Sequence, residues 1–138
     1  MHRVLNVVKR IAIASNFEEA AKVQNAILDE VGKFGYSEPS VFAIKLAVEE
    51  CLNNAIRHGN KMDESKTVRV EYETDASKVR IAVTDEGGGF DPLDVPDPTA
   101  DENLEKPSGR GIMLMRVYMD SVEYSPDGSR VVMVKHNR

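Results

Sequence analysis

The chain has 138 residues, of which 41% are hydrophobic and 30% are charged, and its net charge is -5. This length and composition are typical of one globular domain and exclude an intrinsically disordered chain. The acidic balance argues against a nucleic-acid partner, because binding to a phosphate backbone requires clustered lysine and arginine. We therefore expect a single domain that spans residues 1–138.

The sequence also bears on the cellular compartment. No apolar run approaches the roughly 20 residues that a membrane-spanning helix needs. Cys51 is the only cysteine, so an internal disulfide is excluded. A reducing setting follows from this cysteine count as an expectation. We therefore expect a cytoplasmic protein without membrane contact.

The N-terminal third of the chain predicts one strand and one helix. Residues 3–14 alternate and are rich in β-branched side chains, which favours a strand. Ser15 and Glu18 form a capping-box pattern, and apolar residues then recur at helical spacing over about 16–34.

A second helix is predicted from about Pro39, which favours a helix start, to Gly59 and Asn60. Within it, Glu50 and Asn54 are four residues apart and project side by side along one border of the apolar face. A carboxylate and a carboxamide at the margin of a core either face water or line a cavity.

In the second half of the chain the hydrophobic period changes to two. Runs at about 68–72 and 79–83 predict a hairpin, and runs at about 120–125 and 129–136 predict two closing strands. Between these pairs, residues 91–108 are polar and rich in proline. A long segment of this kind inside a small domain is typical of a functional lid or binding loop.

The first glycine motif lies just before this loop. Gly87, Gly88 and Gly89 follow the end of a predicted strand, where missing Cβ atoms let a flat ligand approach the backbone. An ordinary turn remains an alternative. The chain has no P-loop sequence, and no helix opens after Gly89 as a dinucleotide-binding turn requires.

The second glycine motif, with Gly109 and Gly111, precedes a predicted helix. Free backbone NH groups at a helix start favour an anionic group such as a phosphate. Lys106 and Arg110 add positive charge there, although an ordinary N-terminal loop would have the same composition.

Taken in order, the motifs resemble those of the GHKL superfamily of ATPases and kinases, whose fold is the Bergerat fold. The segments that match its N, G1 and G2 boxes are Glu50-x-x-x-Asn54-Ala-x-x-His58-Gly59, Asp85-x-Gly87-x-Gly89-Phe90 and Gly109-x-Gly111-Ile-x-Leu114. The chain is short and carries no helix with a phosphoacceptor histidine. Within the superfamily it is therefore most similar to the bacterial anti-sigma factor serine-protein kinases.

The resemblance implies an α+β fold, an α/β sandwich in which helices cover one face of a mixed, mostly antiparallel sheet. It also implies ATP and Mg²⁺ bound between the helices and a lid at about 91–108. Asn54 matches the family's magnesium ligand, and Glu50 matches its proposed general base.

Asp85 matches the aspartate that accepts a hydrogen bond from the adenine amino group, so adenine selectivity is expected there. The other nucleotide-binding residues that the resemblance implies are Gly87, Gly89, Lys106, Gly109, Arg110 and Gly111. Related chains often hold an arginine where this chain has Lys106, which binds phosphate with less directional geometry.

The N box contains a second pair with the same spacing, Glu49 and Asn53. Alignment on Asn-Ala-x-x-His-Gly favours Glu50 and Asn54. We interpret His58 as a structural residue, whereas Arg57 either approaches the triphosphate or lies on the surface.

The resemblance implies an anti-sigma factor that uses Mg-ATP to phosphorylate a serine of a STAS-type anti-anti-sigma protein and that sequesters a sigma factor. It favours a homodimer, with the first strand and helix as the candidate surface. Two alternatives remain. One is a non-catalytic protein-binding module gated by ATP, and the other is the catalytic domain of a histidine kinase.

Overall fold

The structure is a computed structural model that describes residues 7–87 and 115–137. The lid predicted at 91–108 and the start of the helix predicted after it lie outside this part of the chain. So do five of the predicted site residues, namely Gly89, Lys106, Gly109, Arg110 and Gly111.

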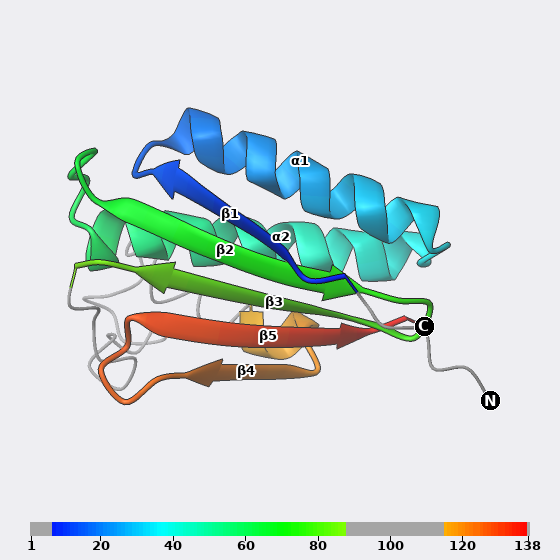
Figure 1. Cartoon of the computed structure of the whole chain (residues 1–138). Helices are drawn as coiled ribbons and strands as arrows, with labels where there is room; N and C mark the ends of the chain where they lie inside the picture. The colour runs from blue at the N-terminus through cyan, green and yellow to red at the C-terminus, as the bar shows by residue number, and fades with distance from the viewer. Residues whose placement is uncertain (1–6, 88–114, 138) are drawn as a thin grey trace, which may run out of the picture.

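Five strands form one sheet in the order β1-β2-β3-β5-β4 (Figure 1). They are β1 (Lys9–Ala14), β2 (Thr67–Thr74), β3 (Lys78–Asp85), β4 (Ser121–Tyr124) and β5 (Arg130–His136). The four pairings among them are all antiparallel. Each predicted strand is present, although β1 begins only at Lys9.

Two long helices, α1 (Phe17–Lys33) and α2 (Glu38–Asn54), lie on the same face of this sheet (Figure 1). Their apolar stripes and the inward side chains of the strands form one buried core. Residues 115–118, the described part of a further helix, add the buried Met115 to it. The predicted α+β sandwich with helices on one face is confirmed. None of the helices in the described ranges is long and apolar enough to cross a membrane.

The cap of α1 differs by one residue from the predicted pair, Ser15 and Glu18. The N-cap is Asn16, whose Oδ1 accepts a hydrogen bond from the Glu19 backbone NH at 2.9 Å. Ser15 is buried, and its hydroxyl donates to the Lys66 carbonyl at 2.7 Å. Because this distant carbonyl occupies the serine, the capping role moves to the next polar residue.

The last turn of the second helix is wider than an α-helical turn. Residues Ala55–Gly59 form a π-helix, η1, and the Asn60 NH donates to the Ala55 carbonyl five residues earlier at 2.8 Å. Lys61 and Met62 then take left-handed conformations, with φ of 52° and 63°, and turn the chain toward β2. Wide turns of this kind are rare in helices and occur often at functional sites.

The alternation of β3 decides where its last residue points. Val79, Ile81 and Val83 are buried against the helices, and Asp85 has the same parity. A carboxylate is therefore placed on the core face of the sheet, at the end of a strand and beside η1.

Candidate functional site

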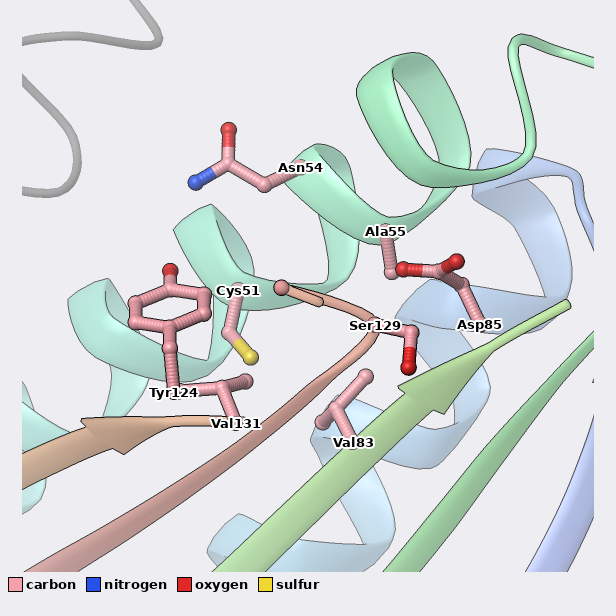
Figure 2. A pocket seen from close by; sticks show the side chains of 9 residues that line it. Cys51, Asn54, Ala55, Val83, Asp85, Tyr124, Ser129 and Val131 are labelled. Carbon is pink, nitrogen blue, oxygen red and sulfur yellow. The ribbon is translucent and has the colours of Figure 1, made fainter. Parts of the chain in front are cut away.

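A small hollow lies where the end of α2 meets the ends of β3, β4 and β5 (Figure 2). Asn54 and Asp85, predicted independently from two different motifs, both line it. The full lining is Cys51, Asn54, Ala55, Val83, Asp85, Tyr124, Gly128, Ser129 and Val131. The structure thus brings the N-box carboxamide and the G1-box carboxylate into one cavity.

Asn54 is the last residue of α2 and is only 4% exposed. Its amide nitrogen is buried, and no group in the described part of the chain completes a regular hydrogen bond with it. A buried amide costs free energy when its hydrogen bonds are not made. Its position is therefore better suited to contacting a polar ligand than to packing.

Asp85 is 7% exposed at the end of β3. One carboxylate oxygen, Oδ1, accepts a hydrogen bond from the Gly87 backbone NH at 3.0 Å. Its own backbone NH donates to the Ser129 carbonyl at 2.9 Å. Burial raises the pKa of the Cys51 thiol and the charge of Asp85 raises it further, so Cys51 is a neutral part of the lining.

The end of η1 and the segment after β3 approach each other at backbone distance. A Cβ placed on Gly87 would overlap the carbonyl oxygen of Gly59, and a Cβ on Gly59 would overlap the carboxylate of Asp85. Only glycine fits at both positions without a shift of backbone or carboxylate. The close approach at Gly87 is therefore one to the backbone of Gly59, and the role of Gly87 in the wall of a base pocket stays a prediction.

Asn60 connects this contact to the rest of the sheet. The residue is 0% exposed, and its amide nitrogen donates to the Ser15 hydroxyl at 2.8 Å and to the Thr67 carbonyl at 3.1 Å. Its Oδ1 accepts from the Glu86 backbone NH at 2.8 Å. Sequence reasoning treated Asn60 only as a helix stop. Its sole local signal is a polar residue directly after the helix-ending glycine.

Glu50 lies one turn before Asn54 on α2 and does not line the hollow. Its side chain is half-buried. Burial raises the pKa of Glu50, the neighbouring Glu49 raises it further, and Arg57 opposes both effects. A raised pKa suits a carboxylate that has to accept a proton near neutral pH.

The alternative pair, Glu49 and Asn53, faces a different part of the molecule. Both residues line a groove between α1 and α2, together with Arg57 and Phe17. The Arg57 guanidinium lies over the Phe17 ring, 5.2 Å from its centroid. The structure therefore separates Asn54 from Glu49 and Asn53, and of these four residues only Asn54 shares a cavity with Asp85. Arg57 is exposed, which agrees with the predicted surface position and not with a contact to the triphosphate.

His58 also lies outside the hollow and is exposed. Partial burial lowers the pKa of His58, and the positive charge of Arg57 lowers it further. The imidazole is therefore predominantly neutral at pH 7.

The described residues fit a magnesium ion that is bound together with a nucleotide. They contain no group of three or more His, Cys, Asp or Glu side chains that is arranged to hold a metal. Mg²⁺ bound with a nucleotide takes one or two protein oxygens and completes its shell with phosphate and water oxygens. The single carboxamide of Asn54 in a buried position is a donor set of this kind.

Comparison with known proteins identifies the family. The family described as histidine kinase-like ATPase domain matches residues 13–135 of the chain. The chain belongs to this family. The predicted relationship to GHKL ATPases is thereby confirmed, and membership of an ATPase family implies an ATP-binding domain.

Individual relatives narrow this assignment. The chain is 31% identical over 131 residues to the anti-sigma F factor of Clostridium beijerinckii, and the match covers 91% of each protein. It is 31% identical over 112 residues to the serine-protein kinase RsbW of Listeria monocytogenes, covering 74% of this chain and 69% of that protein. The chain therefore belongs to the group of anti-sigma factors and RsbW-type serine kinases.

A solved structure supports the same fold. The structure of the RsbU and RsbW domains of Rv1364c from Mycobacterium tuberculosis matches with a TM-score of 0.58 and 17% identity. The match covers 96% of this chain and 32% of that longer chain. At this identity the likeness applies to the fold alone.

The close approach of Gly59 and Asp85 predicts that a methyl group added at Gly59 weakens ATP binding. Gly59→Ala should lower ATP affinity by about tenfold or more, because the new methyl group displaces the Asp85 carboxylate. Gly32→Ala is the matched control, since Gly32 lies in α1 with no heavy atom near the added methyl group. Calorimetric titration with ATP measures both variants. Equal affinities for the two would contradict this account.

The Asn60 network predicts a large loss of stability. Asn60→Ala should lower the free energy of unfolding by about 1–3 kcal/mol, because it removes three hydrogen bonds, one of them buried, that the Asn60 carboxamide makes to three segments. Asn137→Ala removes one exposed hydrogen bond, to the Ala76 carbonyl, and should cost about 0.5 kcal/mol or less. Urea unfolding of both variants checks this, and similar losses would show that the buried network carries no special weight.

Proposed function

We propose that this protein is an anti-sigma factor with Mg-ATP-dependent protein serine kinase activity. The observation that carries the proposal is the convergence of Asn54 and Asp85 in one hollow between α2 and the sheet. The family and its relatives support the same activity, since they include proteins named anti-sigma F factor and serine-protein kinase.

In the proposed complex the adenine end of ATP binds beside Asp85. The Asp85 carboxylate accepts a hydrogen bond from the adenine amino group, which guanine lacks at the same ring position. Gly87 is proposed to lie in the wall of the base pocket, where its missing side chain lets the backbone approach Gly59. Gly89, Lys106, Gly109, Arg110 and Gly111, all outside the described residues, complete the nucleotide site under a lid at about 91–108.

The Asn54 oxygen is proposed to coordinate the magnesium ion that accompanies the phosphates. When bound, this ion neutralises charge that develops on the transferred phosphoryl group and on the leaving diphosphate. The chain's contribution at this point is a fixed oxygen donor at the end of a rigid helix.

Glu50 is proposed as the general base of the transfer. A serine hydroxyl of the substrate attacks the γ-phosphorus, the bond to the β–γ bridging oxygen breaks, and ADP leaves. The hydroxyl proton passes to the Glu50 carboxylate. Glu50 lies one turn away from Asn54 on the same helix and outside the hollow. This position fits a carboxylate that contacts the substrate serine and not the adenine ring.

The partners proposed for this activity are a sigma factor and a STAS-type anti-anti-sigma protein that carries the substrate serine. We also propose a homodimer, with β1 and α1 as the candidate surface, and a cytoplasmic location. Phosphorylation of the antagonist would leave the sigma factor bound to the kinase.

A non-catalytic module gated by ATP is the second candidate. The observation that favours it is the absence of Glu50 from the hollow that Asn54 and Asp85 share. In such a module ATP would shape a partner surface without phosphoryl transfer.

The role of Asp85 predicts a preference for adenine. Wild-type protein should bind ATP at least about tenfold more tightly than GTP, because guanine presents a carbonyl to the carboxylate. Asp85→Asn should reduce this ratio, since a carboxamide offers both a donor and an acceptor to the base. Calorimetric titration with ATP and GTP measures the ratio. Equal binding of both nucleotides by the wild type would overturn the role of Asp85.

The kinase proposal predicts different effects at adjacent glutamates. Glu50→Gln should lower phosphoryl transfer to a cognate anti-anti-sigma protein by about a hundredfold or more and leave ATP affinity nearly unchanged. Glu49→Gln should retain transfer, because Glu49 faces the groove between α1 and α2. Transfer from labelled ATP is the measurement.

The pKa of Glu50 gives this test a second arm. The base acts in its deprotonated form, and its pKa is raised. Wild-type transfer should therefore decline as pH falls through an inflection above the usual glutamate value of 4.5. Normal ATP binding without any transfer by the wild type would favour the non-catalytic module.

A further inference from the structure

An apolar patch lies where α2 meets the helix at 115–118, both of which cover the same face of the sheet (Figure 1). Phe42 of α2 is 54% exposed and Tyr118 is 37% exposed, and their rings meet edge to face with centroids 6.4 Å apart. Leu46, one turn after Phe42, is half-buried. Single exposed apolar residues are ordinary on a protein surface, whereas a contiguous set marks an interaction site. We call Phe42, Leu46 and Tyr118 the apolar ridge.

The apolar ridge continues along α2 into the proposed site. One row of α2 side chains at a spacing of four residues consists of Phe42, Leu46, Glu50 and Asn54. Each step of four residues turns the row by about 40° around the helix axis. Exposure falls along the row, from 54% at Phe42 to 4% at Asn54, and the two residues between them are half-buried. The row therefore leads from the exposed surface of α2 to the hollow.

The helix determines how far the apolar ridge lies from the proposed general base. Phe42 and Glu50 are eight positions apart on α2, which corresponds to about 12 Å along the axis. A protein interface of ordinary size buries roughly 800 Å² on each partner, and a disc of that area reaches about 16 Å from its centre. A protein that places a serine at Glu50 is therefore large enough to contact Phe42 at the same time.

We propose that the apolar ridge is the docking surface for the protein whose serine is phosphorylated. This partner presents an apolar patch about 12 Å from its substrate serine, and the patch packs on Phe42 and Tyr118. The serine hydroxyl alone does not distinguish one protein from another, so the choice of substrate comes from this remote contact. The contact is the same before and during transfer, and it therefore lowers KM without changing kcat. The inference rests on the proposed function, because it requires Glu50 to receive the serine.

The kinetic test compares Phe42→Ala with Phe34→Ala. Phe34 is the matched control, since it is 40% exposed but caps the end of α1 and is not part of the row on α2. The probe is a STAS-type protein that the wild type phosphorylates. Phe42→Ala should raise KM for this protein by about tenfold or more and leave kcat and the Kd of ATP within about twofold. Phe34→Ala should leave all three constants unchanged.

Protection of a thiol at position 42 provides a second readout. Cys51 is the only cysteine of the chain and is 2% exposed, so Phe42→Cys introduces a single accessible thiol. With ADP and a saturating amount of the STAS-type protein, alkylation of this thiol by iodoacetamide should slow by about fivefold or more, because the core of an interface excludes solvent. Alkylation of Phe34→Cys should proceed at an unchanged rate.

The outcomes separate this inference from the proposed function. If the wild type transfers no phosphoryl group to a STAS-type protein, the proposed function fails, and the inference falls with it. If the wild type transfers and Phe42→Ala retains the wild-type KM, only the inference is overturned. A loss that appears in kcat or in the Kd of ATP would also overturn it, because it would show that Phe42 supports the nucleotide site.

Other occupants of the apolar ridge would be recognised by the same thiol. Protection of position 42 that grows with the concentration of this chain alone would assign the surface to a second copy. Protection by a sigma factor and not by the STAS-type protein would assign it to the sigma factor. Either result would overturn the inference.

Discussion

The structure depends on one contact between backbones, that of Gly59 at the end of η1 with the segment Asp85 to Gly87 after β3. Neither glycine could carry a side chain at this point, because a Cβ on Gly87 would overlap the Gly59 carbonyl oxygen and a Cβ on Gly59 would overlap the Asp85 carboxylate. The Asp85 carboxylate therefore lies directly below the helix end, and the hollow opens beside it. A pair of glycines far apart in sequence thus determines the position of the charged group at the site.

Asn60 stabilises this contact from the side of the sheet. Its carboxamide joins the end of β1, the start of β2 and the residue after β3 through three hydrogen bonds. Since the side chain is completely buried, these bonds are shielded from competition with water. The hydrogen bonds that support the site are therefore the same ones that connect the first three strands of the sheet order.

Much of the fold was predictable, because strands and helices follow local periods. The two long helices and the five strands were found from alternation and helical spacing, with ends displaced by a few residues. The cap of α1 was predicted one residue too early, at Ser15, because its hydroxyl bonds to the Lys66 carbonyl in a distant turn. No local pattern contains that information. The same holds for Asn60, whose partners come from three separate segments.

The site was predictable in part. Spacing alone did not distinguish Glu50 and Asn54 from Glu49 and Asn53, and resemblance to a family was needed to choose. The structure separates Asn54 from Glu49 and Asn53, which face a different cavity, whereas Glu50 lines neither of the two. Tyr124 was not found, since it comes from a strand distant in sequence and belongs to no motif. Residues of the second glycine motif lie outside the described ranges and stay predictions.

The wide turn of η1 has a consequence for chain length. Its hydrogen bond from Asn60 to Ala55 spans one residue more than an α-helical bond, so the turn accommodates an additional residue between Asn54 and the glycine contact. Removing one residue there would rotate Asn54 relative to Gly59 and take the carboxamide out of the hollow. Side chains at the exposed positions of this segment, Arg57 and His58, are under no such restriction. The segment therefore tolerates changes of composition there far better than any insertion or deletion.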